Sequence, residues 1–345
     1  MQTVQPSDLA AWLARLADLH IGVVGDVAVD AYWTLDPGAA TVSLETGLPT
    51  QPVRTQRYFG GGAANVAVNL RALGCGRVSI FGVLGADPWG ACLQQLLDER
   101  NITRDGLVCQ ARDWQTVAFI KPHVDGVEQS RWDMGDFNQL HTGTAEQLVA
   151  AVAAALPTLD ALVINGQARM TVHQAGVVSA IDALLARHRD TITIVDQRDP
   201  EPTYAHGILK INVHEALRRV GLPAVADPGV AGARVVEVAD HLYRERGQPL
   251  FVTLGDAGMV CCDDTGVTMW PAINCADQPL DPVGAGDAAL AGITAVLAAG
   301  GTLHQAAQVG TWTAAVAVQK RQQTGQVYPA ELVTLMESLQ RSSAR

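Results

Sequence analysis

Short apolar runs alternate along this chain with helical patterns, and no other feature constrains the fold as strongly. The runs have the length and continuous apolar character of parallel strands covered on both faces. They are "IGVVGDV", "VSIFGVL", "ALVIN", "ITIVD", "ILKIN" and "LFVTLG". Between them lie "AANVAVNLRAL", "PWGACLQQLLDER", "TAEQLVAAVAAAL" and "GARVVEVADHLYRER". This alternation predicts an α/β fold with a doubly wound, mostly parallel sheet flanked by helices, whose ligands bind beyond the carboxyl ends of the strands.

Two segments interrupt the alternation. Residues 31–59 contain three prolines, and residues 113–133 carry Asp125-Gly126, a dipeptide typical of hairpin turns. We expect both to form a small β lid over the sheet edge. The chain has 345 residues, 48% of them hydrophobic, and no repeat or charged linker divides it. We therefore predict one domain over residues 1–345, with the lid segments inserted in it.

The charge balance narrows the classes of partner. A net charge of -11 would repel nucleic acid and anionic lipid surfaces, so we expect neither as a partner. The six cysteines form no C-x-x-C pair, which indicates reduced thiols and a cytoplasmic protein. The first 20 residues predict an amphipathic helix capped near Ser7 rather than a signal peptide, and no apolar run is long enough to span a membrane.

The stretch "FGGGAANVAVNLRALG", residues 59–74, is the first candidate for a binding site. Its glycines would let a ligand approach the backbone, and Asn65 offers donors and an acceptor to hydroxyl groups. The alternative is a tight turn before a helix. A dinucleotide fingerprint would need a third glycine where Asn65 stands and should follow the first strand, which argues against a nicotinamide dehydrogenase.

The stretch "DPVGAGDAALAG", residues 281–292, is the second candidate. Backbone N–H groups from Gly284 to Asp287 could stabilise charge on a phosphoryl group, while Asp287 takes a proton from an attacking hydroxyl. We expect the helix end to lower the pKa of the Asp287 carboxyl and an incoming phosphate to raise it again. The structural alternative is an acidic residue that stabilises the helix dipole.

Two further elements are compatible with phosphoryl transfer. "VTLGDAG", residues 252–258, ends a strand in a turn suited to a nucleotide. "KINVHE" places Asn212 and Glu215 three apart at a strand-to-helix junction, where they could hold Mg²⁺ through water. The alternative for this pair is a helix cap and a surface acid. A Walker A loop is absent, because none of Lys121, Lys210 and Lys320 follows a glycine.

These four elements, in this order, resemble the ribokinase-like sugar kinases, also called the phosphofructokinase B family. "GGGAANVAVNLRALG" is similar to the N-terminal signature of that family and "DPVGAGDAALAGIT" to its C-terminal one. "VTLGDAG" and "NVHE" fall where its nucleotide turn and N-x-x-E motif would be. The resemblance extends over most of the chain, from residue 20 to residue 330.

The resemblance implies an ATP-dependent kinase that phosphorylates a hydroxyl of a sugar or sugar phosphate. It implies that Asp287 is the general base and that the anion hole is formed by Gly284, Ala285 and Gly286. It assigns the sugar hydroxyls to Asp30, Gly60, Gly61 and Asn65. It assigns Mg²⁺ and phosphate to Asn212 and Glu215, the nucleotide to these two with Thr253, Gly255 and Gly258, and a monovalent cation such as K⁺ to Asp281.

Within the family, "VVGDVAVDAYW" and "VSLETGLPTQPV" are similar to the branch that phosphorylates D-glycero-D-manno-heptose 7-phosphate. That branch usually has "RISPEAPVPV", where this chain has Thr41 and Leu44–Gly47 instead. It tends to carry Asp-Pro-Lys where this chain has Asp196–Arg198, and Asp-Tyr near Asn165–Gln167. These departures lie on the acceptor side, so a different sugar or sugar phosphate stays an alternative. Arg131, Arg169 and Arg198 are cations available to a phosphorylated acceptor, or ordinary surface residues.

Two alternatives to the sugar kinase stay open on sequence grounds. One is a nucleoside kinase of the same fold, with the lid enclosing a base. The other is a sugar-binding or regulatory protein that no longer transfers phosphate, which the retained Asp287 and Gly-Ala-Gly turn argue against. We also expect a homodimer through the lid, because relatives often pair in this way and a thin sheet rarely buries both faces alone.

Overall fold

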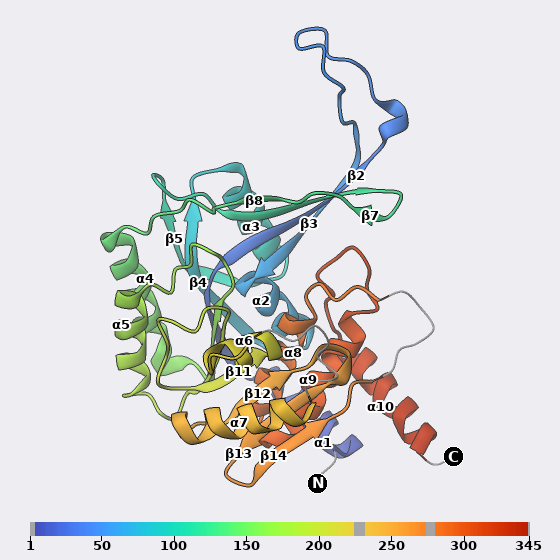
Figure 1. The fold of residues 1–345 in the computed structure, drawn as a ribbon. Helices are drawn as coiled ribbons and strands as arrows, with labels where there is room; N and C mark the ends of the chain where they lie inside the picture. Colours follow the sequence, from blue (N-terminus) through green and yellow to red (C-terminus); the bar gives the residue numbers. More distant parts are fainter. Residues whose placement is uncertain (1–3, 224–231, 274–279, 344–345) are drawn as a thin grey trace.

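The chain folds into two sheets, with helices on both faces of the larger one (Figure 1). The computed structural model describes residues 4–223, 232–273 and 280–343. The larger sheet has nine strands in the order β14-β13-β12-β11-β10-β9-β1-β4-β5. Its parallel strands are β1 (His20–Gly25), β4 (Arg77–Gly85), β5 (Thr103–Gln110), β9 (Ala161–Gly166), β10 (Ile192–Gln197), β11 (Ile208–Asn212) and β12 (Leu250–Thr253).

An antiparallel hairpin completes one edge of this sheet. It consists of β13 (Met259–Asp263) and β14 (Gly266–Trp270). The predicted class, a mostly parallel α/β sheet flanked by helices, is therefore confirmed.

The helices cover the sheet because consecutive strand residues point to opposite faces and both faces are apolar. On β1, for example, Val23 packs into one core and Val24 into the other. The first core includes residues of α1 (Pro6–Leu16), α2 (Ala63–Ala72), α3 (Pro88–Asp98), α8 (Ala285–Ala298), α9 (Leu303–Ala317) and α10 (Pro329–Ser343). The second includes residues of α4 (Thr142–Ala155), α5 (Ala175–Leu185), α6 (Val213–Arg219) and α7 (Gly232–Arg246).

The smaller sheet forms the predicted lid. Its strands are β2 (Val27–Leu35), β3 (Val53–Gly62), β6 (Val117–Val124), β7 (Val127–Glu128) and β8 (Trp132–Met134). Their order is β3-β2-β6-β7, with β8 paired to β6. The Asp125-Gly126 hairpin is confirmed, because both residues have positive φ, 49° and 81°, between the antiparallel strands β6 and β7. Residues 36–52, which we call the arm, join β2 to β3 and project away from the body (Figure 1).

Two local predictions were wrong. The run "IGVVGDV" is not one strand, because β1 ends at Gly25 and β2 begins at Val27. Asp26 separates them: its carboxylate accepts hydrogen bonds from the N–H groups of residues 167, 168 and 172 and from the Thr171 hydroxyl, all 2.8–2.9 Å long. Helix α1 is capped by Gln5 rather than Ser7, since Pro6 suits the first helical position and the Gln5 N–H donates to Asp8.

Two further findings concern the protein as a whole. No helix among residues 4–223, 232–273 and 280–343 is long and apolar enough to cross a membrane. The five cysteines in those ranges are free thiols, namely Cys75, Cys92, Cys109, Cys261 and Cys262, while Cys275 lies outside the described residues. A cytoplasmic location stays a prediction.

Candidate active site

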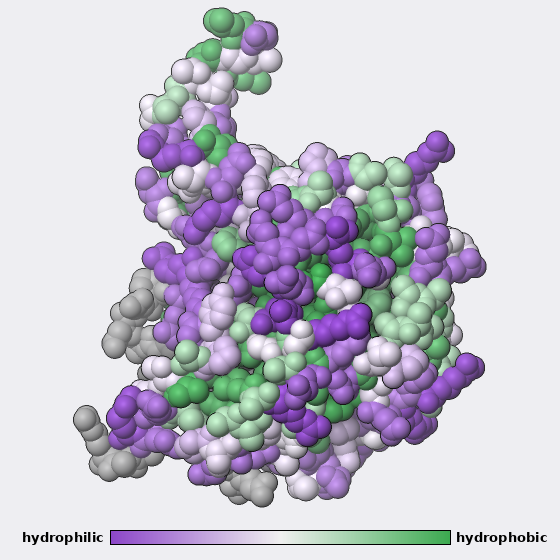
Figure 2. All heavy atoms as spheres, turned by 180° about the vertical axis from the view of Figure 1, so that it is seen from behind, coloured by the Kyte–Doolittle hydropathy of each residue, from purple (hydrophilic) through white to green (hydrophobic). Residues whose placement is uncertain are grey.

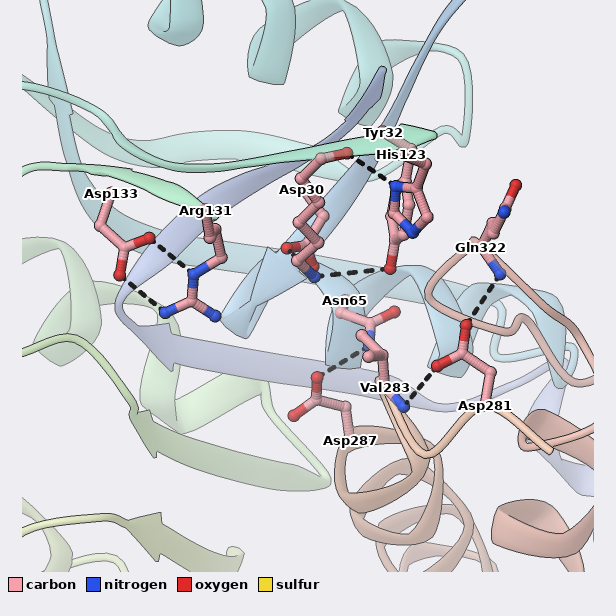
Figure 3. A network of polar contacts seen from close by, with 11 residues as sticks. Asp30, Tyr32, Asn65, His123, Arg131, Asp133, Asp281, Val283, Asp287 and Gln322 are labelled. Carbon is pink, nitrogen blue, oxygen red and sulfur yellow. Dashed lines mark hydrogen bonds and ion pairs between the residues drawn. The ribbon is translucent and has the colours of Figure 1, made fainter. Parts of the chain in front are cut away.

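Two helix starts bring the glycine-rich motifs together beyond the carboxyl edge of the sheet. Helix α2 begins after Gly62 and carries Asn65, while α8 begins after Gly284 and carries Asp287 as its third residue. The Asn65 Nδ2 donates to Asp287 Oδ2 at 2.7 Å. Figure 3 shows this contact between the two helices, with Asp30 of the lid sheet on the other side of Asn65.

Asn65 is itself held in one orientation. The Asn69 Nδ2 donates to the Asn65 side-chain oxygen at 3.1 Å, so the Asn65 amide nitrogen faces Asp287. The Asn69 oxygen in turn accepts from the Val327 N–H at 3.2 Å. Both asparagines are buried, and this chain of bonds therefore fixes the direction from which Asp287 receives its hydrogen bond.

Glycine is required where the backbone turns into this site. Gly284 has φ +79°, and a Cβ there would lie 2.9 Å from the Thr324 carbonyl oxygen and 3.0 Å from Asn65 Nδ2. A Cβ on Gly61 would lie 3.0 Å from Asp30 Oδ2. These glycines leave bare backbone beside Asp30, Asn65 and Asp287, which is what a bound ligand needs.

One N–H group of the predicted anion hole already has a partner within the protein. The N–H of Ala285 donates to the Pro282 carbonyl at 3.2 Å, so it is already used in a turn. The N–H groups of Gly286 and Asp287 belong to the first turn of α8, where helical N–H groups have no carbonyl four residues earlier in the helix. The N–H groups of Gly286 and Asp287 are therefore the ones that this turn leaves for an anion, at the positive end of the helix dipole, and the anion hole stays a prediction.

A buried ion pair that the motifs did not indicate lies next to this turn. Lys210 of β11 and Asp196 of β10 are 2.6 Å apart, with side chains only 5% and 4% exposed. A Cβ on Gly286 would lie 3.4 Å from the Lys210 ammonium. Gln167 also donates to Asp196, at 3.2 Å. The site thus contains a fixed positive charge beside the first turn of α8.

The pKa of the half-buried Asp287 carboxyl is raised to about 7. Burial is the main cause, and the charges of Asp196 and Asp30 add to it. The Asn65 hydrogen bond and Lys210 oppose the rise without cancelling it. Our expectation of a lowered pKa was therefore wrong, because desolvation and neighbouring carboxylates outweigh the helix end. A carboxyl with this pKa is poised to take up a proton near neutral pH.

A cavity of about 560 Å³ reaches the same turn from the side of the nucleotide motif. Its walls include the predicted residues Thr253, Gly255 and Gly258, together with Ala285 and Gly286. Apolar side chains form much of the rest, among them Met259, Ile273, Ala289, Ala314 and Val318. An apolar slot that ends at a helix N-terminus suits a flat base with a phosphate chain.

Asn212 and Glu215 form the helix cap of the alternative interpretation, but Glu215 is buried and is therefore not the surface acid that this interpretation expected. The Asn212 Oδ1 accepts from the Glu215 N–H at 3.0 Å, and Glu215 Oε2 accepts from the Asn212 N–H at 2.8 Å. Burial and the nearby Asp196 charge raise the pKa of Glu215. Among the residues that the structure describes, no group of three or more His, Cys, Asp or Glu could ligate a metal directly.

Other predicted residues already have partners within the protein. The Asp281 carboxylate accepts from the N–H groups of Val283 and Gln322, at 3.1 and 2.8 Å (Figure 3). Arg131 binds Asp133 through two hydrogen bonds of 2.6 and 2.7 Å. Exposed Arg169 is 3.8 Å from the Asp136 carboxylate, and Arg198 donates to Gln167 at 3.3 Å. Asp30 is paired with Lys121.

A model of the pfkB family of carbohydrate kinases matches residues 23–329, which is most of the chain. The chain belongs to the pfkB carbohydrate kinase family. Members of this family are phosphotransferases that act on sugar hydroxyls, so the predicted family and enzyme class are confirmed. The roles of the individual motif residues in this transfer are proposals.

The relatives and solved structures are consistent with this membership. The bifunctional protein HldE of Gluconobacter oxydans is 33% identical over 305 residues, which cover 87% of this chain and 61% of that protein. The chain thus spans less than two thirds of that relative. Phosphofructokinase-2 from Escherichia coli, solved with potassium, has a TM-score of 0.72 at 17% identity, and Arabidopsis thaliana ribokinase, solved with ribose and ATP, has 0.68 at 18%. These alignments cover 93% and 92% of this chain, and 99% of each structure.

The raised pKa of Asp287 predicts a pH-dependent gain in stability for the Asp287→Asn variant. The folded protein holds a proton on this group between the ordinary pKa of 3.8 and about 7, and that stabilising contribution is lost as the pH rises. Asparagine never ionises, so the melting temperature of the variant should exceed that of the wild type by about 2 °C or more at pH 8 and converge with it near pH 4. Thermal unfolding from pH 4 to 8 measures this.

Asp105→Asn provides the control, because Asp105 is an exposed carboxylate on β5. It should show no comparable gain at high pH. An Asp287→Asn variant that melts at or below the wild-type temperature at every pH would contradict the assigned electrostatics.

Proposed function

We propose that this chain is an ATP-dependent kinase that transfers the γ-phosphoryl group to a hydroxyl of a sugar or sugar phosphate. One observation carries the proposal: the apolar cavity ends at Ala285 and Gly286, one residue before Asp287. A phosphate chain extending from that cavity and a hydroxyl lying against Asn65 and Asp30 would meet at the Asp287 carboxylate. The γ-phosphate of the donor, the acceptor hydroxyl and the base would then lie next to one another, as an in-line transfer needs.

The protein groups would divide the work as follows. Asp287 takes the proton of the acceptor hydroxyl. The hydroxyl oxygen then bonds to the γ-phosphorus as the bond from that phosphorus to the ADP oxygen breaks. The N–H groups of Gly286 and Asp287 stabilise charge on the transferring group. Lys210 adds a positive charge beside Gly286, and its pair with Asp196 keeps the ammonium in place. The lysine takes the place of the basic side chain that a Walker A loop would supply.

The nucleotide and metal are also part of the proposal. Thr253, Gly255 and Gly258 line the cavity, and its apolar walls suit adenine. Mg²⁺ bound with ATP would offset the phosphate charges. Glu215 and Asp196 lie close enough to raise the pKa of Glu215, so a hydrated cation there would relieve their repulsion. A monovalent cation near Asp281 would have to share the carboxylate with the N–H groups of Val283 and Gln322.

The acceptor is the least constrained part of the proposal. Asp30, Asn65 and the backbone at Gly60 and Gly61 would bind its hydroxyl groups. The arginines considered for a phosphorylated acceptor are partly engaged, since Arg131 is bound by Asp133. A panel of acceptors should therefore include both free and phosphorylated sugars.

The test is ATP consumption with Mg²⁺ across hexoses, pentoses, heptose 7-phosphate, hexose phosphates and nucleosides. We expect turnover on a sugar or sugar phosphate, and a kcat lower by about 10²- to 10⁴-fold in Asp287→Asn, as is usual for general acid-base groups. Asp105→Asn should retain wild-type kcat. Turnover on a nucleoside alone would favour the nucleoside kinase, and silence on every acceptor would favour a binding protein. An Asp287→Asn variant within tenfold of the wild type would refute the base.

We further propose that two copies of the chain pair through the lid. The arm carries three exposed apolar residues, Val42, Leu44 and Leu48, which are 63%, 98% and 65% exposed. Figure 2 shows apolar atoms gathered at the end of the arm, away from the body. Apolar side chains concentrated on a projecting segment mark a protein contact, and a second lid would cover both the arm and the thin sheet.

Light scattering tests the pairing. The wild type should have twice the 36.4 kDa chain mass at micromolar concentration, and the Leu44→Asp, Leu48→Asp double variant should approach the single-chain mass. Phe137→Asp is the matched control, because Phe137 is 89% exposed but lies outside the arm. A monomeric wild type, or a double variant that remains a dimer, would contradict pairing through the arm.

A further inference from the structure

A second buried ion pair lies in the lid, on the acceptor side of the site. Lys121 of β6 and Asp30 of β2 are 2.7 Å apart, with side chains 5% and 9% exposed. Strands β2 and β6 are parallel neighbours, so the contact joins segments 91 residues apart in the chain. Burying two charges is unfavourable, and an apolar pair of similar volume is often as stabilising or more so. Stability alone is therefore a weak explanation for the pair.

The lysine is held in a fixed position. Its ammonium is 3.4 Å from the Tyr32 hydroxyl and 4.9 Å from the centre of the Tyr32 ring. Tyr32 in turn packs against Phe59 and His123, each with ring centres 5.7 Å away. The carbonyl of Lys121 lies 2.9 Å from His123 Nδ1. These contacts hold the positive charge of Lys121 in place next to Asp30.

The Lys121 charge favours the ionised form of Asp30. Burial raises the pKa of the Asp30 carboxyl, and Lys121 is the first of the groups that lower it. Arg131 lowers it further and Glu128 raises it, while Asp287 and Tyr32 are the other titratable groups that interact with it. The loss of Lys121 would leave desolvation almost unopposed. A protonated Asp30 would then donate one hydrogen bond where a carboxylate accepts several.

The two oxygens of Asp30 face different neighbours. Oδ1 is the atom paired with Lys121, whereas Oδ2 lies where a Cβ on Gly61 would approach to 3.0 Å. The second oxygen is thus directed toward the bare backbone of the glycine run. Lys121 thus pairs with one oxygen only, and the other lies beside the glycine backbone.

We propose that Lys121 is a positioning residue for the acceptor: it holds Asp30 as an oriented carboxylate whose Oδ2 accepts hydrogen bonds from acceptor hydroxyls. The inference rests on the proposed function, because it takes Asp30 to contact the acceptor. Lys121 itself touches neither the acceptor nor the transferring phosphoryl group. A purely structural pair would instead stabilise the lid without affecting how acceptor binding depends on pH.

The experiment compares wild type, Lys121→Met, Lys121→Arg, Asp30→Asn and the Lys121→Met, Asp30→Asn double variant. KM and kcat are measured from pH 6 to 9 with the acceptor that the wild type uses. Lys121→Met should raise the acceptor KM at pH 7 by roughly 10- to 100-fold, since a buried carboxylate loses its partner. That KM should fall as the pH rises and Asp30 ionises again, and the KM for ATP should stay within about twofold of the wild type.

The other variants test whether Lys121 acts through Asp30. Lys121→Arg should restore most of the acceptor affinity, and the double variant should bind the acceptor no more weakly than Asp30→Asn alone. A direct readout is the carboxyl ¹³C shift of Asp30, whose titration should move to higher pH in Lys121→Met than in the wild type. Thermal unfolding of each variant verifies that it is folded before kinetics are compared.

Two sets of results would overturn the inference, and they are distinguishable. An active wild type whose Lys121→Met variant keeps the wild-type acceptor KM, or shows a raised KM that is the same at every pH, would defeat the role of Lys121 alone. A double variant in which the two single-variant increases in acceptor KM multiply would also contradict the role of Lys121, because the two residues would then act independently. Silence of the wild type on every acceptor would defeat the proposed function and this inference together.

Discussion

The hydrogen bond between Asn65 and Asp287 is the contact on which the rest of the site depends. It joins the first turns of α2 and α8, and both helices start where glycine conformations leave the backbone bare. Because Asn69 fixes the Asn65 amide, the Asp287 carboxylate receives a donor from one defined direction. The parallel sheet beneath supplies the platform, since the carboxyl ends of β10, β11 and β12 place Asp196, Lys210 and Thr253 around the same point.

Charge in this region is arranged as a set of opposed pairs. Burial raises the pKa of Asp287, and the charges of Asp196 and Asp30 raise it further. Each of those two carboxylates is paired with a buried lysine. Lys210 faces the helix turn and Lys121 lies in the lid, so in the proposed mechanism one pair would border the transferring group and the other the acceptor. Such local devices would let a chain with a net charge of -11 hold an anionic substrate without an extended basic surface. Each lysine also reduces the repulsion between its partner carboxylate and Asp287.

The sequence allowed the sheet, the lid and the two glycine motifs to be predicted, because periodicity and glycine spacing are local signals. Contacts between distant segments were not predictable in this way. Lys210 stands inside the apolar run "ILKIN" and Asp196 ends "ITIVD", and a charge in a buried strand beside an acid on its neighbour was a usable signal that we missed. To predict the Lys121–Asp30 pair, one would have to know that β6 lies beside β2. The prediction of a lowered pKa for Asp287 was wrong because it used only the helix dipole, which can be inferred from local sequence. The burial and the neighbouring carboxylates that raise the pKa depend on tertiary packing.

The central claim is that Asp287 accepts the acceptor proton with a pKa that its neighbours raise to about 7. The most direct measurement is kcat/KM for the acceptor from pH 5 to 9, in wild type and in Asp196→Asn, because this ratio reports ionisations of the free enzyme and the substrates are the same in both. The account predicts a loss of activity below about pH 7 in the wild type and a shift of that limb to lower pH in the variant, since Asp196 raises the pKa of Asp287. A wild-type profile that stays flat down to pH 5, or a limb that does not move in Asp196→Asn, would contradict it.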